Sequence, residues 1–275
     1  VTHFRPIACC NTIYKTLTKV LCARLSLILP DIINYTQSAF IKGRDIVGNI
    51  LICQDLIRMY GRGVCSPRIL MKLDLQKAYD SVEWSFIDEM LEAMGCPRRI
   101  HNLIMQCISS PTYTLSINGE TFGFVTGKRG LRQGDPLSPL LFTICLEYLS
   151  RLLEITQRLP RFRYHPMCKN LRISHLCFVD DLILFSKGDV QSVALLCSAF
   201  DSFSKASRLK MNKLKSSFYC TGIDQDKIDR ISSLTGICKG LLPFKYLGVN
   251  ISPKRLSVKD CNGLIEKLTS RIKGI

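Results

Sequence analysis

The length, composition and charge of this chain narrow what it can be. Its 275 residues are 47% hydrophobic, which is enough apolar material for a large core in one big domain or two smaller ones. The 38 Lys and Arg residues against 22 Asp and Glu residues give a formal net charge of +16, and a protein this basic usually binds a polyanion, with nucleic acid as the first candidate. A merely solubilising basic surface is the weaker alternative.

Membrane insertion and a disulfide framework are both disfavoured. No signal peptide leads the chain, and no apolar run approaches the length of a membrane span. The 14 cysteines are scattered without a CxxC pair, so we expect reduced thiols in a nuclear or cytoplasmic setting. Because the sequence lacks an initiator Met and starts in mid-pattern, we expect a piece of a longer protein.

Helices dominate the first 60 residues. After a short extended start, apolar residues between 4 and 30 recur at threes and fours, which predicts one long helix. Its apolar stripe comprises Ile13, Leu17, Val20, Leu21, Leu25 and Leu29. A basic loop at 37–44 follows, and a second helix over 46–59 ends at a glycine cluster.

The middle of the chain alternates strands and helices. Residues 68–75 are apolar except near the end, which predicts a strand buried on both faces. A helix over 84–94 is stopped by Gly95 and Pro97. Strands over 112–117 and 121–126 flank Asn-Gly, the strongest short hairpin signal in the chain. A glycine-rich turn at 127–135 then leads into an apolar helix over 136–157.

The last third mixes both kinds of element. It contains a predicted hairpin over 175–185, a helix over 190–206, strands over 216–220 and 245–251, and a basic helix from Val258. Strands and helices alternate unevenly, with hairpins among them. This order predicts an α+β fold rather than a regular βαβ array.

Two adjacent carboxylates, Asp180 and Asp181, interrupt the apolar hairpin. We predict a tight turn at this pair. Like charges side by side among apolar residues repel one another and lose solvation if they are buried. A divalent metal such as Mg²⁺ would turn that cost into a binding site, whereas an ordinary solvated turn would leave the pair exposed. These two interpretations are about even on this stretch alone.

A third carboxylate, Asp74, ends the predicted strand at 68–75. If that strand lies beside the 175–185 hairpin, Asp74 and Asp180 meet at one edge of a small sheet. Two metal ions about 3.5–4 Å apart, held by such carboxylates, suit in-line displacement at phosphorus. The glycine-flanked stretch at 130–139 also exposes backbone N–H groups that could meet an anionic ligand, although a plain helix cap explains it equally well.

Taken together, seven stretches resemble the reverse transcriptases of non-LTR (LINE-type) retrotransposons, most closely the plant elements. They occur in the family's order and cover nearly the whole chain. The stretches are residues 4–7, 37–44, 74–80, 130–139, 178–181, 209–216 and 246–248.

The resemblance implies a right-hand polymerase that copies RNA into DNA. Residues 1–68 would form partial, mostly helical fingers, and 69–222 an antiparallel palm with a fingers-like insertion at about 95–130. Residues 223–275 would complete the palm and start a thumb. The cofactor would be two Mg²⁺ ions, or Mn²⁺ in their place, and the partners would be an RNA template, a DNA primer or target, and dNTPs. The endonuclease and downstream domains of a retrotransposon polyprotein are expected outside this chain, and no membrane is involved.

The resemblance also implies roles for individual residues. Asp74, Asp180 and Asp181 match the metal-binding catalytic aspartates. Tyr79 matches an aromatic residue under the incoming sugar that excludes a 2′-hydroxyl, with core packing as its competing role. The remaining nucleotide-binding residues would be Arg5 on the triphosphate and Gln133 and Gly134 near the incoming base and template. Lys215 matches a lysine that protonates pyrophosphate, and the template and primer contacts would be Lys42, Arg44, Tyr246, Leu247 and Gly248.

Three positions depart from the family pattern. Val179 precedes the aspartates where Ala is usual, and as a β-branched residue it suits a strand. Arg208 stands where glycine is usual, and His3 where Asp is common. An inactive retroelement remnant that binds nucleic acid without catalysis is the alternative function. A two-metal nuclease or an intron maturase explains fewer of the matched stretches.

Overall fold

The computed structural model describes residues 7–60, 65–254, 266, 269–270 and 272. Arg5, His3 and nearly all of the helix expected from Val258 lie outside the described residues. No helix in the described ranges is long and apolar enough to span a membrane.

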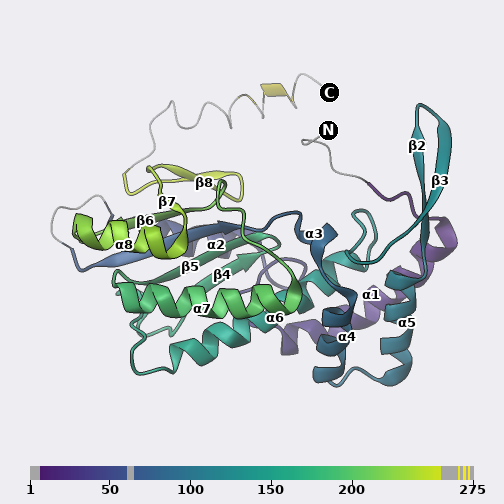
Figure 1. The fold of residues 1–275 in the computed structure, drawn as a ribbon, viewed down its shortest axis with the longest axis horizontal. Helices are drawn as coiled ribbons and strands as arrows, with labels where there is room; N and C mark the ends of the chain where they lie inside the picture. Colours follow the sequence, from purple (N-terminus) through teal and green to yellow (C-terminus); the bar gives the residue numbers. More distant parts are fainter. Residues whose placement is uncertain (1–6, 61–64, 255–265, 267–268, 271, 273–275) are drawn as a thin grey trace.

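A five-stranded sheet forms the centre of the molecule (Figure 1). Its strands lie in the order β4-β5-β1-β6-β7, and only the β6–β7 pair is parallel. The strands are β1 (Arg68–Asp74), β4 (His175–Phe178), β5 (Asp181–Lys187), β6 (Ser217–Thr221) and β7 (Cys238–Lys239). The helix and strand content confirms the α+β class.

Helices cover both faces of the sheet. On one face lie α6 (Ser138–Gln157) and α7 (Val190–Ser207), side by side in Figure 1, with α8 (Gln225–Thr235) beyond α7. On the other face α2 (Ile46–Ile57) packs with the small hairpin of β8 (Phe244–Tyr246) and β9 (Val249–Ile251). The sheet is therefore buried on both sides along most of its length.

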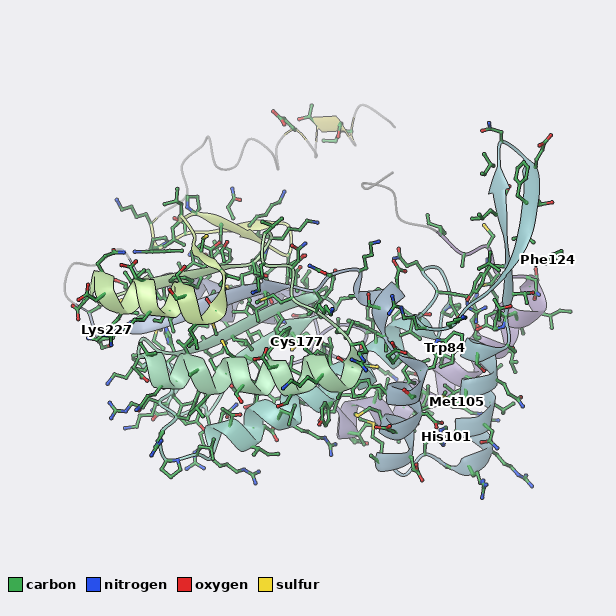
Figure 2. The ribbon with its side chains drawn as sticks, in the orientation of Figure 1. Trp84, His101, Met105, Phe124, Cys177 and Lys227 are labelled. Atoms are coloured by element: carbon green, nitrogen blue, oxygen red, sulfur yellow. The ribbon has the colours of Figure 1, made fainter. Side chains whose placement is uncertain are left out.

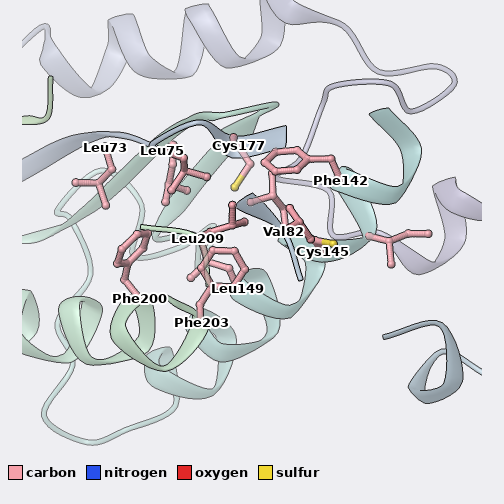
Figure 3. Packing of buried hydrophobic residues seen from close by; sticks show 14 of the residues in the cluster. Leu73, Leu75, Val82, Phe142, Cys145, Leu149, Cys177, Phe200, Phe203 and Leu209 are labelled. Atoms are coloured by element: carbon pink, nitrogen blue, oxygen red, sulfur yellow. The ribbon is translucent and has the colours of Figure 1, made fainter. Parts of the chain in front are cut away.

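The alternation of side chains along β1 divides the core between these faces. Ile69, Met71 and Leu73 belong to the large cluster with α6 and α7, part of which is drawn in Figure 3. Leu70 belongs to the cluster with α2 and the β8–β9 hairpin. Lys72 and Asp74 share the Leu70 side of the strand, so the chemistry-bearing end of β1 faces the β8–β9 hairpin.

The remaining elements lie at one end of the sheet. They are α1 (Thr12–Ile32), α3 (Ala78–Ser81), α4 (Trp84–Ala93), α5 (Arg98–Ser109), β2 (Thr112–Ile117) and β3 (Glu120–Thr126). The β2–β3 hairpin projects from the body, and its Phe124 is 85% exposed (Figure 2). Side chains cap the starts of α1, α2 and α7, where Asn11, Asp45 and Asp189 accept backbone N–H groups.

Most predicted elements are present, with a few corrections. In α1, Thr18, Leu21, Leu25 and Leu29 are buried, whereas Ile13, Leu17 and Val20 of the predicted stripe are exposed. The reason is that α1 contacts α5 and α6 along one side only. Helices α5 and α8 were not predicted. The single strand expected over 245–251 is a hairpin, because both Leu247 and Gly248 have positive φ.

The division into fingers and palm remains a prediction, but some residues of the stretch 1–68 pack against the central sheet. Residues 36–38 lie along β4: Cys177 N donates to Thr36 O, and Ser38 N to Cys177 O. The following helix, α2, packs on the sheet as well. Part of the stretch 1–68 assigned to the fingers therefore contributes to the palm side of the molecule.

Candidate active site

The carboxylates predicted to meet do lie at one edge of the sheet. Asp74 is the last residue of β1 and Asp181 the first of β5, and the antiparallel register pairs them directly. Asp180 precedes Asp181 in the turn, and all three side chains are partly exposed. Both faces of β1 are packed, with Ile69, Met71 and Leu73 in the core cluster of α6 and α7 and Leu70 in the cluster of α2. A slip of one residue would exchange these two sets and move Lys72 and Asp74 to the α6–α7 side, which disfavours any other register.

The turn itself differs from the predicted one. Phe178 pairs with Asp181, so the two turn residues are Val179 and Asp180 rather than the two aspartates. Val179 has φ of 55° and is not part of a strand, contrary to the expectation for a β-branched residue. A branched side chain in the left-handed region is strained, and such strain is commonly found at functional sites.

Asp181 lies in a mixed electrostatic environment. Burial raises the pKa of its carboxyl, Lys72 opposes that shift, and Asp180 and Asp74 add to it. The Nζ atom of Lys72 lies 4.0 Å from Oδ1 of Asp181. Sequence reasoning did not single out Lys72, although its position two residues before Asp74 on a strand places it on the same face.

The backbone of Asp74 is fixed by residues of the segment after α7. Asp74 N donates to Ser216 Oγ at 3.0 Å, and Asn212 N donates to Asp74 O at 2.7 Å. Lys215 precedes Ser216 in this turn and is exposed. The structure therefore brings the Lys215 segment to the strand end that carries Asp74, while the role of the Lys215 side chain remains a prediction.

Tyr79 lies between the aspartates and the core. Its ring stacks on Phe142 of α6 with centroids 4.9 Å apart. Burial, and secondarily the charge of Asp180, raise the pKa of Tyr79 to about 12. The ring is thus both a packing residue and a neighbour of a predicted metal ligand, so the two competing roles are compatible.

The 130–139 turn is held against α3, next to Tyr79. Leu131 N donates to Tyr79 O at 2.6 Å, and Gly130 N donates to Val82 O at 2.7 Å. At Gly130, φ is 87° and a Cβ would lie 2.8 Å from Asp80 O, so only glycine fits. The indole of Trp84, the single Trp of the chain, donates to Gly130 O at 2.7 Å.

Gln133 and Gly134 occupy the next turn, where the N-terminal segment approaches. Ala8 N donates to Gln133 O at 2.9 Å. Gly134 has φ of 103°, and a Cβ there would lie 3.1 Å from Ala8 O. The Gln133–Gly134 turn therefore lies against the described start of the chain, whereas Arg5 falls outside the described residues.

A buried polar network, missed by sequence reasoning, supports this turn. The side chain of Asp135 accepts from Tyr14 OH at 2.5 Å and lies 3.2 Å from Arg132 Nη2. Arg132 also donates to Tyr14 OH and to Cys107 O, and its guanidinium lies 4.2 Å from the centroid of the Tyr14 ring. The pair Arg132–Asp135, spaced i,i+3 around Gln133 and Gly134, was the available signal. It ties α1 and α5 to the turn.

The structure gives Arg44 a role within the protein. Its guanidinium donates to four main-chain carbonyls, those of Pro30, Ile33, Asn34 and Gln37, at 2.5–3.0 Å. These bonds fix the end of α1 and the 36–38 segment. Lys42 is exposed two residues earlier. Template contact remains a prediction for both residues, but the Arg44 donors are already engaged.

The Tyr246–Gly248 turn lies close to the aspartates. Tyr246 is fully buried under the α2 side of the sheet, and Leu247 and Gly248 form the two-residue turn of the β8–β9 hairpin. Lys72 Nζ donates to Lys245 O at 3.0 Å, which fixes the hairpin next to Asp181. The structure thus joins the predicted primer-end turn to the predicted metal site.

The donor set suits a hard divalent cation. Three carboxylates share one strand edge, and the charges of Asp74 and Asp180 contribute to the raised pKa of Asp181, so they are close enough to interact. In the described part of the chain, no three His, Cys, Asp or Glu side chains converge into a ready-made metal cluster. The residues fit the cation chemically, with Lys72 near Asp181.

Comparison with known proteins decides the family. The model of the family described as reverse transcriptase (RNA-dependent DNA polymerase) matches residues 1–251. The chain belongs to the reverse transcriptase family. Members of this family generally use divalent metal ions.

Relatives of this reverse transcriptase chain include retrotransposon proteins. It is 27% identical over 261 residues to an uncharacterized 149 kDa protein of transposon TX1 from Xenopus laevis, covering 94% of this chain and 19% of that protein. It is 27% identical over 262 residues to the Pol polyprotein of the R2DM element from Drosophila melanogaster, covering 90% and 23%. The chain spans about a fifth of the length of these relatives.

Solved structures with the same fold include yeast telomerases. The telomerase of Candida tropicalis in complex with a fragment of telomeric RNA has a TM-score of 0.57 at 14% identity, covering 90% of this chain and 37% of that one. The corresponding Candida albicans complex has a TM-score of 0.54 at 14% identity, covering 87% and 37%. These likenesses confirm the polymerase palm fold predicted from the sequence.

Proposed function

We propose that this chain is the catalytic part of an RNA-directed DNA polymerase of a non-LTR retrotransposon. It would transfer a nucleotide from a dNTP to a primer 3′-hydroxyl on an RNA template. The observation that carries the proposal is the direct pairing of Asp74 with Asp181 beside Asp180, in a chain of the reverse transcriptase family. The net charge of +16 supports nucleic acid as the partner.

The three aspartates would hold two Mg²⁺ ions, or Mn²⁺ in their place. Bound there, the ions would supply activation of the attacking hydroxyl and charge stabilisation of the leaving pyrophosphate. The protein contributes the placement of the ligands. The β1–β5 register sets Asp74 opposite Asp181, the Val179 turn presents Asp180, and Ser216 fixes the backbone of Asp74.

Tyr79, Gln133 and Gly134 would form the nucleotide pocket. The Tyr79 ring stacks on Phe142, so its other face would offer a rigid surface to the sugar of the incoming nucleotide. The Tyr14–Arg132–Asp135 network holds the turn that carries Gln133 and Gly134. Arg5 would bind the triphosphate through its planar fork, and exposed Lys215 would give a proton to pyrophosphate.

Template and primer would lie along the neighbouring surface. We assign the primer end to the Tyr246–Leu247–Gly248 turn because Lys72 fixes that hairpin beside Asp181. Lys42 would contact the template backbone, with Arg44 supporting the loop from within. The described cysteines are all unpaired, which supports work in a reducing nuclear or cytoplasmic compartment.

Primer extension on an RNA template, with dNTPs and Mg²⁺, tests the proposal. The assay should compare the chain alone with the longest polypeptide that carries it, using Asp180→Asn as the matched control. We expect extension by the wild type and at least about a hundredfold less by Asp180→Asn, because the variant loses a metal ligand. Salt-dependent RNA binding should be nearly unchanged, since phosphate contacts are a separate contribution.

The alternative function gives a different pattern. A remnant that binds nucleic acid without chemistry would bind RNA equally well in wild type and Asp180→Asn and would extend no primer in either form. A folded wild type with that behaviour, in the long polypeptide as well as the short chain, would overturn the polymerase proposal.

A further inference from the structure

Lys72 joins two parts of the active site that are distant in sequence. Its Nζ atom donates to the main-chain oxygen of Lys245 at 3.0 Å and lies 4.0 Å from Oδ1 of Asp181. One side chain therefore contacts the hairpin that carries Tyr246, Leu247 and Gly248 and also faces the aspartate pair.

The position of Lys72 is fixed by the strand on which it lies. Leu70, Lys72 and Asp74 point to the same face of β1, and the residues before Lys72 are buried. The Lys72 side chain is only 24% exposed. Its ammonium group lies between the hairpin and the carboxylates, where it has a partner on each side.

The charged groups around Lys72 define what it can do. Asp181 is its nearest carboxylate, and Asp74 and Asp180 add negative charge at the same edge. A divalent cation held by these aspartates would compete with the Lys72 ammonium for the same negative charge, because both are positive and Lys72 Nζ lies 4.0 Å from Asp181. The main-chain oxygen of Lys245 would then be the partner that remains.

We infer that Lys72 is a positioning residue that couples cation binding at Asp74, Asp180 and Asp181 to the placement of the Tyr246–Gly248 turn. The inference rests on the proposed metal site. When the aspartates take up a cation, Lys72 loses its attraction to Asp181 and keeps the hydrogen bond to the Lys245 carbonyl, so the hairpin is held more firmly. The primer-end turn is thus tightened once the cation is bound.

Mn²⁺ binding to the full 275-residue chain, measured by electron paramagnetic resonance, tests whether Lys72 competes with the cation. Lys72→Met removes the competing charge and should tighten Mn²⁺ binding about fivefold. Lys72→Arg keeps the charge and should bind as the wild type does. Lys245→Met is the matched control, because it removes an exposed charge from the same hairpin and leaves the main-chain oxygen in place.

Hydrogen exchange of the amides in residues 244–252 tests whether Lys72 holds the hairpin more firmly once the cation is bound. In the wild type, saturating Mn²⁺ should slow exchange in this peptide. In Lys72→Met the peptide should exchange faster than in the wild type and should not respond to Mn²⁺, whereas Lys72→Arg should restore the response. Tighter Mn²⁺ binding cannot arise from unfolding, because it needs the aspartates in their folded positions.

The outcomes separate the coupling from the metal site. If Asp180→Asn weakens Mn²⁺ binding while Lys72→Met leaves both the affinity and the exchange response unchanged, the coupling is wrong and the metal site stands. If Asp180→Asn has no effect on Mn²⁺ binding, the metal site itself is wrong and the inference is overturned with it. Equal tightening by Lys72→Met and Lys245→Met would reduce the effect to general charge and would also overturn it.

Discussion

Asp74 and Asp181 lie directly opposite each other at the ends of two neighbouring antiparallel strands. Like charges in this relationship destabilise a sheet, since the side chains of directly opposed residues are close together. A cation would relieve that repulsion. The pairing of these two carboxylates therefore destabilises the fold locally, and cation binding would compensate for that destabilisation.

The first prediction concerns the stability cost of Asp181. Replacing it by Asn should raise the melting temperature at pH 7 by about 1–3 °C in the absence of divalent metal, while synthesis is lost. The pKa of Asp181 is raised, so its charged form is disfavoured in the folded state. That penalty is present at neutral pH and disappears as the pH falls below the ordinary Asp pKa of about 3.9.

Thermal melts of both proteins from pH 7 to pH 4 check this prediction. The advantage of Asp181→Asn should shrink toward zero as the wild-type carboxyl takes up its proton. A variant that melts below the wild type at pH 7 would show instead that attraction to Lys72 outweighs burial and repulsion.

The second prediction concerns sugar selection by Tyr79. Tyr79→Val should increase ribonucleotide incorporation relative to deoxynucleotide incorporation by about tenfold or more, since a lost steric contact of this kind is worth at least 1–2 kcal/mol. Tyr79→Phe keeps the ring on Phe142 and should retain the preference. Single-nucleotide extension with dNTP and NTP measures the ratio. An unchanged ratio in Tyr79→Val would leave Tyr79 as core packing alone.

The third prediction concerns Arg208, which follows α7. Arg208 has φ of 63°, and its N–H donates to Ser204 O as a left-handed helix cap. This geometry explains why glycine is usual at this position in the family. Arg208→Gly should therefore raise the free energy of unfolding by about 1 kcal/mol, because glycine adopts this conformation without strain.

Arg208→Ala is the matched control for that change. Alanine loses the same charged side chain but keeps a Cβ, so it should give little or no stabilisation. Urea unfolding of the three proteins measures the difference. Equal effects of Gly and Ala would assign the change to charge rather than to backbone strain.

The fourth prediction concerns acid stability and His175. This side chain is buried between Thr36 and Ser150, whose hydroxyls lie 2.7 and 3.1 Å from Nε2, and burial lowers its pKa to about 3. A histidine held neutral in the fold stabilises the protein above its unfolded pKa. As the pH falls from about 6.5 toward 3, the unfolded chain binds a proton at this histidine and the folded protein does not. The free energy of unfolding should therefore decrease by about 1.4 kcal/mol per pH unit.

Urea midpoints between pH 7.5 and pH 5 measure this slope. His165 is also buried, with its pKa lowered to about 3, so the wild type should lose stability through both residues. His175→Gln should show a clearly shallower decline than the wild type. If the urea midpoint of His175→Gln fell with pH as steeply as that of the wild type, His175 would not contribute to the loss of stability in acid.

The local sequence pattern determined many of the helices and strands. It also determined which residue types could carry out the chemistry. The apolar runs over 68–75 and 175–185 predicted the central strands, and Asn118-Gly119 predicted the β2–β3 turn. The matched stretches led to the reverse transcriptase family, which the comparisons confirm. These features depend on residues close in sequence or on motifs in a fixed order, so a single chain can reveal them.

Only the tertiary structure decided which distant groups meet. Asp74 and Asp181 are paired by strand register across more than a hundred residues, and Lys72 reaches Lys245 across 173 residues. Packing also directs the Arg44 guanidinium to the carbonyls that end α1, a contact that the sequence did not indicate, while template contact by Arg44 remains a prediction. Long-range contacts of this kind follow from the packing of the whole core, because no local propensity specifies the partner of a polar side chain.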